Sequence, residues 1–300
     1  MAGICDGRVV IVTGAGRGIG RCHALAFAAE GASIVVNDLG GEVDGSGSSS
    51  GPAGAVVEEI RSLGGQAVAD TSDVSTWQGA EKLVRTAVDA FGRLDVLVNN
   101  AGILRDRMLV NMTEQEWDSV MAVHLKGTFG PSHFAALHWR DRSKAGETVS
   151  GRLINTSSAS GLYGNPGQTN YGAAKAGIAA FTIIAAKELQ RYGVTVNAVA
   201  PGARTRMTEP LGYGASQPEV DQFDAFAPEN ISPLVVWLGS SRSQRVTGRV
   251  FNVAGGKISV ADGWSHGPSV DKASRWAPEE LDEVVVELLG KAAPPADIFA

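Results

Sequence analysis

The chain has 300 residues, of which 44% are apolar, and a formal net charge of −6 at pH 7. A chain of this length can bury a substantial core as one large domain or two small ones. The acidic balance, without long charge runs, gives no electrostatic footprint for nucleic acid, and no segment approaches the roughly 20 continuous apolar residues of a membrane span.

The chain begins with a predicted strand, a glycine-rich turn and a helix. Residues 8–12 form a short, β-branched run typical of a buried strand, and a helical pattern covers residues 23–30. Between them, residues 13–20 have the spacing T-G-x-x-x-G-x-G. Glycines let the backbone approach a phosphate, and the helix start offers free N–H groups and a positive dipole end. We therefore predict cofactor contacts from Gly14, Arg17, Gly18, Ile19 and Gly20.

The second predicted strand, residues 32–37, ends at Asp38, eighteen residues after Gly20. A carboxylate at about this distance accepts hydrogen bonds from the adenosine ribose and repels a 2′-phosphate, which favours NAD over NADP. Arg17 argues for NADP because it could reach a phosphate, but direct repulsion between two anions gives Asp38 more weight. A plain turn-forming role for Asp38 stays a weaker alternative.

Strand-like and helix-like segments alternate through most of the remaining chain. A Gly/Ser-rich connection, residues 40–54, is interpreted as a surface loop inside the nucleotide-binding unit. Further strands are predicted at residues 66–69, 94–98, 151–155, 194–199 and 248–253, and helices at 75–91, 114–139, 171–191 and 228–238. This alternation predicts a doubly wound α/β fold with a mostly parallel sheet and helices on both faces.

The alternating segments fit one dinucleotide-binding and catalytic domain, residues 1–256. Residues 257–300 form a C-terminal extension in which residues 277–290 have helical spacing of apolar side chains. We expect this extension to pack on the substrate cleft or on a partner subunit.

Tyr171, Lys175 and Ser158 form the most informative pattern in the chain. Four residues make about one helical turn, so Tyr171 and Lys175 share one face of the predicted helix. An ammonium beside a phenol favours the phenolate and lowers the pKa of the tyrosine from about 10. Ser158, after a predicted strand, can hydrogen-bond the same substrate oxygen. A Tyr-x-x-x-Lys pair alone also occurs on solvated helix faces, but the glycine turn favours a hydride-transfer site.

In order and spacing these motifs resemble the short-chain dehydrogenase/reductase family, over about residues 6–256. Residues 99–102, Asn-Asn-Ala-Gly, and 201–202, Pro-Gly, complete the match. The resemblance implies a Rossmann-type sheet of seven strands, with Tyr171 as general acid/base, Ser158 positioning the reacting oxygen and Lys175 holding the nicotinamide ribose. It also implies cofactor contacts by Asp73, Val74, Asn100, Ala101, Gly102, Tyr171, Lys175, Gly202, Ala203, Arg204 and Thr205.

One position departs from the family pattern. The fourth catalytic residue of the family is an asparagine followed three residues later by glycine, and His124 takes its place before Gly127. In the family this residue helps to hold a water that relays protons to the lysine. We therefore expect His124 at the catalytic site, where its backbone carbonyl can do this work, with a structural histidine as the alternative.

The histidine at position 124 also narrows the resemblance to one branch of the family. Together with residues 37–41, 102–107 and 157–165, His124 resembles the family branch of the (3R)-hydroxyacyl-CoA dehydrogenase units of peroxisomal multifunctional enzymes type 2, also classed as 17β-hydroxysteroid dehydrogenases type 4. This resemblance implies NAD-dependent oxidation of a 3-hydroxyacyl-CoA to the 3-oxoacyl-CoA, as a β-oxidation step on a fatty acyl or steroid side-chain thioester. Dehydrogenation of free steroids or other secondary alcohols stays an alternative, and so does a non-catalytic nucleotide-sensing scaffold.

The expected partners follow from the same reasoning. A CoA thioester is polyanionic whereas the chain is acidic, so we expect a local basic rim. Its candidates are Arg105, Arg107, Arg204, Arg206 and Lys257. The resemblance implies a homodimer or homotetramer, and the loop at about residues 208–227 is expected to meet the substrate.

The cysteines and the two ends of the chain allow predictions about metal binding and cellular location. Cys5 and Cys22 form neither a metal-binding spacing nor a disulfide framework, so we expect no metal and a reducing compartment. The first eight residues lack a hydrophobic signal segment, and the last four are no peroxisomal address of the Ser-Lys-Leu type. We therefore expect a cytoplasmic protein.

Overall fold

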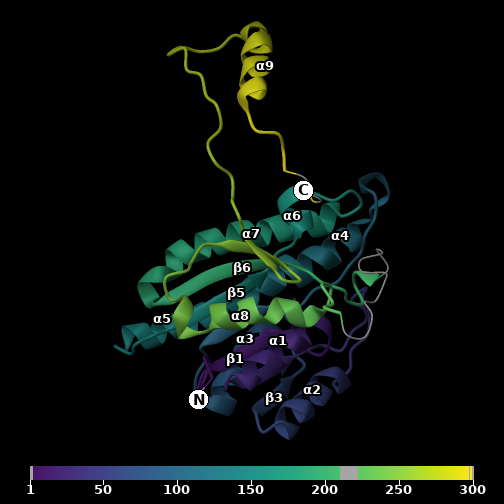
Figure 1. Cartoon of the computed structure of the whole chain (residues 1–300), viewed down its shortest axis with the longest axis vertical. Helices are drawn as coiled ribbons and strands as arrows, with labels where there is room; N and C mark the ends of the chain where they lie inside the picture. Colours follow the sequence, from purple (N-terminus) through teal and green to yellow (C-terminus); the bar gives the residue numbers. More distant parts are fainter. Residues whose placement is uncertain (1–2, 210–221, 297, 299–300) are drawn as a thin grey trace.

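Eight strands form the middle layer of the protein in a computed structural model that describes residues 3–209, 222–296 and 298 (Figure 1). The sheet has the order β3-β2-β1-β4-β5-β6-β7-β8, and its first seven strands run parallel. The strands are β1 (Val9–Thr13), β2 (Ser33–Asn37), β3 (Gln66–Asp70), β4 (Val96–Asn99), β5 (Gly151–Thr156), β6 (Val194–Gly202), β7 (Val250–Ala254) and β8 (Lys257–Ala261).

Helices cover both faces of the sheet (Figure 1). The α-helices are α1 (Gly18–Ala29), α2 (Gly51–Ser62), α3 (Trp77–Phe91), α4 (Glu114–Met121), α5 (Gly127–Lys144), α6 (Ala159–Tyr163), α7 (Thr169–Leu189), α8 (Ser232–Gly239) and α9 (Leu281–Lys291). Short turns of 3₁₀-helix are η1 (Leu109–Asn111), η3 (Gln190–Tyr192), η5 (Pro228–Ile231), η6 (Ser241–Ser243) and η7 (Pro278–Glu280). The predicted doubly wound α/β fold is therefore confirmed.

The central strands are buried on both faces, which explains their nearly continuous β-branched runs. In β1, Val10 and Val12 join the core beneath α1, α2 and α8. Val9 and Ile11 point the other way, into the core beneath α3, α5 and α7. Successive side chains of a strand alternate between faces, so one apolar run supplies both cores.

The sheet has one strand more than the seven that were predicted. β8 pairs antiparallel with β7, through register pairs from Val250 and Ala261 to Ala254 and Lys257. Gly255, with φ of 54°, and Gly256 make the two-residue hairpin turn between them. The sequence alone did not indicate β8 because its Ile258 and Val260 alternate toward solvent, where they remain about half exposed. The sheet thus continues to Ala261, past the predicted domain end at residue 256.

The long helix predicted over residues 114–139 is interrupted. One turn of π-helix, η2 (Ala122–Lys126), separates α4 from α5. A π turn inserts an extra residue into the helical ladder and often marks a functional site. Here the wide turn carries the buried side chain of His124. Its signal in the sequence is weak, since residues 114–126 keep an ordinary helical composition.

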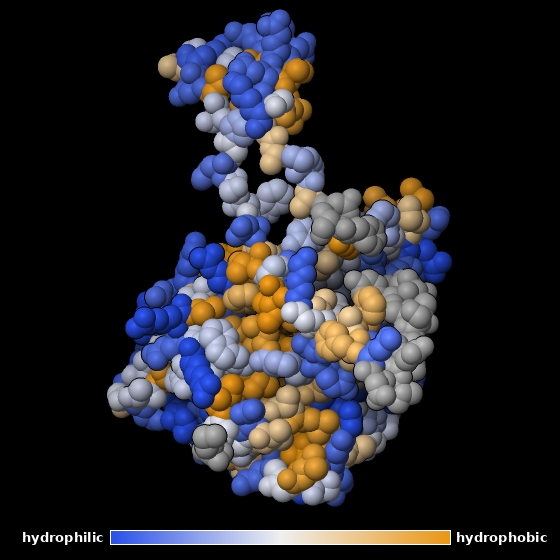
Figure 2. All heavy atoms as spheres, in the orientation of Figure 1, coloured by the Kyte–Doolittle hydropathy of each residue, from blue (hydrophilic) through white to orange (hydrophobic). Residues whose placement is uncertain are grey.

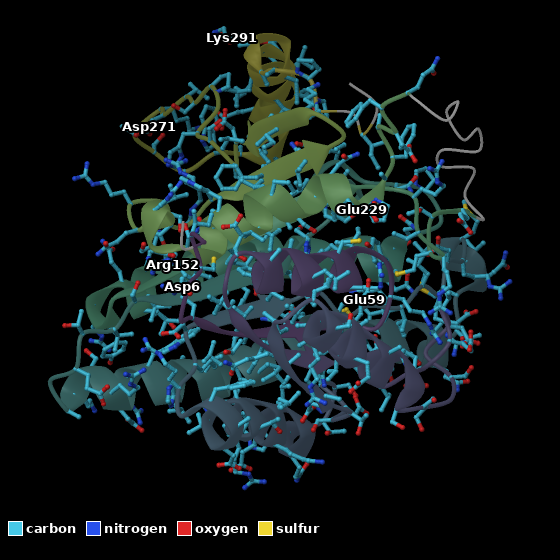
Figure 3. All side chains as sticks on the ribbon, turned by 60° about the horizontal axis from the view of Figure 1, so that its bottom comes forward. Asp6, Glu59, Arg152, Glu229, Asp271 and Lys291 are labelled. Atoms are coloured by element: carbon cyan, nitrogen blue, oxygen red, sulfur yellow. The ribbon has the colours of Figure 1, made fainter. Side chains whose placement is uncertain are left out.

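The segment after β8 stands away from the sheet and its covering helices, and α9 forms its outer part (Figure 1). Lys291 and Asp271 of this tail lie toward the top of Figure 3, apart from Glu59 on α2, which lies near the middle of the view. No residue of α9 is buried. Residues 210–221 of the predicted substrate loop lie outside the described residues.

A substitution at Trp139 tests the packing beneath α5. Its side chain is buried, and its Nε1 donates to the carbonyl of Leu94 at 2.7 Å. Trp139→Phe leaves that carbonyl without its donor, and we expect it to lower the free energy of unfolding by about 1–3 kcal/mol in urea titrations. The matched Trp264→Phe changes a fully exposed ring and should have an effect below about 0.5 kcal/mol. Equal effects of the two variants would contradict this packing.

Candidate active site

A cavity of about 320 Å³ opens at the carboxyl ends of the parallel strands. It lies where the strand order reverses, since β1 is flanked by β2 on one side and by β4 on the other. In open α/β sheets this switch point is where ligands bind, because the loops on its two sides diverge and leave a crevice. Residues following β1, β2, β3, β4 and β6 all line the cavity.

The glycine turn after β1 forms one wall of the cavity. Gly14 and Gly18 have φ of +62° and +51°, a conformation that L side chains rarely adopt. A Cβ atom at Gly20 would lie 2.1 Å from the carbonyl oxygen of Gly14, so the turn requires glycine there. Arg17 is the N-cap of α1 and its side chain makes no capping hydrogen bond to the helix, which leaves the first N–H groups of the helix to a ligand. All five residues predicted in this turn line the cavity, and the turn fits a dinucleotide pyrophosphate.

Asp38 closes the next side of the cavity. Its Oδ2 accepts from the amide of Gly16 at 2.8 Å and its Oδ1 from the amide of Gly40 at 2.7 Å. The turn-forming role and the cavity-lining role of Asp38 therefore coexist. Arg17 donates from Nη1 to the carbonyl of Gly41 at 3.3 Å. The residues predicted beside the adenine and the nicotinamide that also line the cavity are Asp73, Val74, Asn100, Ala101, Gly102, Ala203 and Thr205.

Tyr171 and Lys175 both lie on α7 and line the cavity's inner end. Lys175 Nζ donates to the carbonyl of Thr156 at 2.6 Å and lies 5.5 Å from the centroid of the Tyr171 ring. Ser158 lies close enough to Tyr171 to influence the pKa of its phenol. Ser158 is also the N-cap of α6, where its Oγ accepts from the amide of Ser160 at 3.2 Å. The structure thus brings the three predicted catalytic side chains together.

The pKa values of this group differ from the prediction. Burial raises the pKa of Tyr171 to about 12, and the negative charge of Asp106 acts in the same direction, while the hydrogen bond from Ser158 lowers it. Burial lowers the pKa of Lys175 to about 7. The prediction of a lowered tyrosine pKa is therefore wrong for the protein without its cofactor. Desolvation opposes the charged form of each group, and at 5.5 Å from the ring the ammonium does not compensate for it.

His124 lies beside this group with its side chain turned to the segment after β4. Its Nε2 lies 2.7 Å from the carbonyl oxygen and 3.1 Å from the amide nitrogen of Ile103. The imidazole meets the Tyr171 ring edge-on, with centroids 5.1 Å apart. Burial, together with the charge of Lys175, lowers the pKa of His124 to about 3, so the ring is neutral. A Cβ at Gly102 would lie 2.5 Å from His124 Cε1, which explains the glycine.

Three predicted site residues do not line the cavity, namely Ser158, Gly202 and Arg204. Ser158 caps α6 through the amide of Ser160, whereas Arg204 forms an ion pair with Asp224. Sequence reasoning missed the loop after Asp38, although Gly41, Glu42, Val43 and Gly45 line the cavity. Its Gly/Ser composition resembles that of any exposed loop. The only available signal was its position, directly after the residue predicted to bind the ribose.

The fold and the cavity are those of a dinucleotide-dependent oxidoreductase. The family model for short chain dehydrogenases matches residues 8–214, and the chain belongs to the short-chain dehydrogenase/reductase family. It is similar to the hydroxyacyl-CoA dehydrogenase ChsB1 of Mycobacterium tuberculosis, with 44% identity over 287 residues that cover 92% of this chain and 86% of that protein. The predicted family is therefore confirmed.

Two further similarities bear on the tail and on the predicted branch of the family. The peroxisomal multifunctional enzyme type 2 of Mus musculus is 47% identical over 253 residues, which cover 84% of this chain and 32% of that enzyme. This chain thus matches about a third of the length of that relative. The crystal structure of a short chain dehydrogenase from Mycobacterium avium is 60% identical, with a TM-score of 0.89, and the match covers 98% of this chain and 99% of that one.

The described residues contain neither a candidate membrane-spanning helix nor a candidate metal-binding cluster. None of the helices in this part of the chain has the length and apolar character needed to cross a membrane. Within the same residues, no group of three or more His, Cys, Asp or Glu side chains is placed to hold a metal ion.

Lys175 gives a test of the burial argument. Its pKa falls from an ordinary 10.5 to about 7 on folding, so the unfolded chain binds the proton more tightly. Stability should therefore rise as the pH increases from about 7 to 10.5, and the folded protein bears the full cost of burying the charge below about pH 7. Lys175→Met should raise the free energy of unfolding at pH 6 by about 1–3 kcal/mol and flatten that rise.

Urea titrations at pH 6 and pH 9 measure both effects. Lys187→Met, at an exposed position of the same helix, is the matched control and should leave the pH dependence as it is in the wild type. A lower unfolding free energy for Lys175→Met at pH 6 would show that the bond to Thr156 outweighs the desolvation of the ammonium.

Proposed function

We propose that the protein oxidises a 3-hydroxyacyl-CoA to the 3-oxoacyl-CoA with NAD, as a β-oxidation step on a fatty acyl or steroid side-chain thioester. The observation that carries the reaction type is the phenol of Tyr171, beside Lys175 and near Ser158, on the wall of a cavity whose glycine turn fits a dinucleotide. The substrate class is supported by the similarity to a hydroxyacyl-CoA dehydrogenase over 92% of this chain.

The proposed mechanism assigns one task to each side chain. Tyr171, as phenolate, accepts the proton of the substrate hydroxyl, and Ser158 donates a hydrogen bond to the same oxygen. Lys175 in its protonated form favours the phenolate. When bound, NAD supplies the hydride acceptor and a positive charge within the cavity. Burial raises the pKa of Tyr171, so positive charge near its hydroxyl is needed to favour the phenolate.

We assign His124 a positioning role in this mechanism. Its ring contacts Tyr171 edge-on while its Nε2 binds the backbone of Ile103, so it links the catalytic tyrosine to the segment after β4. A neutral imidazole suits this place, since a cation there would repel Lys175. Its Nδ1 is buried without a hydrogen-bond partner among the described residues and can hold a water. In this assignment His124 replaces the asparagine of the family's proton relay.

The choice of NAD over NADP rests on the carboxylate of Asp38. It faces the cavity and is held there by the amides of Gly16 and Gly40. A 2′-phosphate at this place would meet a fixed negative charge. Arg17, the residue that argued for NADP, is engaged with the carbonyl of Gly41.

Initial rates with NAD and NADP over short, long and steroid-chain 3-hydroxyacyl-CoA esters test the proposal. We expect turnover of thioesters with NAD, and a loss of at least about 1,000-fold in kcat/KM for Tyr171→Phe, which lacks the proton acceptor. Tyr163→Phe is the matched control, because Tyr163 lies outside the cavity and its hydroxyl accepts from Asn252. Turnover of free hydroxysteroids alone would contradict the thioester assignment. Faster rates with NADP would contradict the role given to Asp38.

We further propose that the tail after β8 packs on a second copy of the chain in a homodimer or homotetramer. The helix α9 exposes Leu281, Val285, Val286 and Leu289. Figure 2 shows hydrophobic residues beside hydrophilic ones on the outer part of the tail. A helix of 11 residues is marginal in water by itself, so a partner surface is needed to hold it. The match to the Mycobacterium avium structure covers 98% of this chain and so includes most of the tail.

The proposed location is the cytoplasm, where the thiols of Cys5 and Cys22 stay reduced.

Hydrogen exchange of α9 tests this packing. In the wild type its amides should exchange at least about ten times more slowly than in Val285→Ser with Leu289→Ser, because the double variant loses the apolar face. Lys291→Gln, at the exposed end of the same helix, is the control and should keep the protection. Fast exchange of α9 in the wild-type oligomer would contradict the proposal.

A further inference from the structure

The loop between β2 and α2 lies across the mouth of the active-site cavity. We call residues 41–49 the cleft loop. The amide of Leu104, after β4, donates to the carbonyl of Val43 at 3.1 Å. A Cβ at Gly45 would lie 3.1 Å from Ile103 Cδ1, so the loop approaches that side chain closely. Because the loop reaches across from β2 to the segment after β4, it forms a wall shared by the cofactor and substrate sides of the cavity.

Two ion pairs attach the cleft loop to the segments after β4 and β6. Asp44 pairs with Arg105, after β4, at 3.8 Å, and Glu42 pairs with Arg206, after β6, at 3.5 Å. The two arginines are two of the five residues predicted for the rim that meets the CoA phosphates. In this structure the carboxylates of the cleft loop neutralise both of them.

Both ion pairs are weak enough for another anion to replace their carboxylates. The carboxylate side chains are 50% exposed at Asp44 and 67% exposed at Glu42, and both N–O distances are longer than those of a good hydrogen bond. Exposed pairs of this kind contribute little to stability, because water and salt compete for both partners. An arginine binds a phosphate more strongly and in a fixed fork geometry. A polyanion at the mouth of the cavity can therefore displace the two carboxylates.

We infer that the cleft loop sets how strongly the enzyme prefers phosphate-bearing acyl carriers, because its carboxylates compete with the phosphates for Arg105 and Arg206. In the free enzyme Glu42 and Asp44 occupy Arg206 and Arg105, and they release these arginines to the phosphates of the CoA moiety. A substrate without phosphates gains nothing from the exchange and leaves the pairs in place. This inference rests on the proposed function, since it assumes that the substrate arrives as a CoA thioester.

Two thioesters of the same 3-hydroxyacyl group test the inference, one with CoA and one with N-acetylcysteamine, which has no phosphate. The quantity measured is the ratio of the N-acetylcysteamine KM to the CoA KM at low ionic strength. Glu42→Gln with Asp44→Asn should raise this ratio about 3- to 10-fold, because the arginines no longer exchange partners. The matched control is Glu58→Gln, which breaks an exposed ion pair with Arg61 outside the cavity and should leave the ratio unchanged.

The arginine side of each pair gives an independent test. Arg206→Ala should lower the ratio about tenfold, because a phosphate contact is lost. In the Arg206→Ala background, Glu42→Gln should have no further effect, since its partner is gone. Additive effects of these two substitutions would show that Glu42 acts in some other way and would overturn the inference.

The remaining outcomes separate this inference from the proposed function. If both thioesters are oxidised and the ratio stays the same in the Glu42 and Asp44 variant, the role of the loop is wrong and the thioester assignment stands. If neither thioester is oxidised, the proposed function fails and the inference fails with it.

Discussion

Desolvation of Tyr171 and Lys175 is the constraint on which the rest of the site depends. Both side chains line a cavity at the end of the sheet, where burial opposes the phenolate of one and the ammonium of the other. Such a pair resists charging in the free protein, and the charge of a bound cofactor changes that balance. In the proposed mechanism, the phenolate of Tyr171 therefore forms chiefly when the cofactor is bound.

A buried polar network holds the strands and helices around this pair. Asn99 at the end of β4 donates from Nδ2 to Ser132 Oγ on α5 and to Asn155 Oδ1 on β5, each at 2.9 Å. Asn155 in turn donates to Thr182 Oγ1 on α7 at 2.9 Å. Because α7 also carries Tyr171 and Lys175, the network fixes the catalytic helix against the strands whose ends form the cavity. A polar network of this kind specifies one arrangement where apolar packing would tolerate several.

The sequence predicted the features that depend on a local pattern of residues. The buried parallel strands have continuous β-branched runs, and the glycine turn has a spacing that only a close backbone approach requires, as the clash at Gly20 shows. It did not predict what depends on distant partners. β8 is a strand because β7 offers it an edge, and the π turn at His124 follows from the contact with Ile103. The sign of the Tyr171 pKa depends on burial, which spacing along a helix does not show.

The proposed function requires the cavity to repel a phosphate at one place and to bind phosphates at another. Next to β2, Asp38 places a negative charge that disfavours a phosphate on the adenosine ribose. A CoA thioester brings phosphates to the same mouth and needs positive charge there. The cleft loop lies between these two places, and its carboxylates pair with the arginines on the far side. Uncovered arginines would also attract a cofactor that carries a 2′-phosphate. In our proposal the loop carboxylates cover them until a polyanion arrives, which reconciles the proposed preference for NAD with the proposed CoA substrate in a protein of net charge −6.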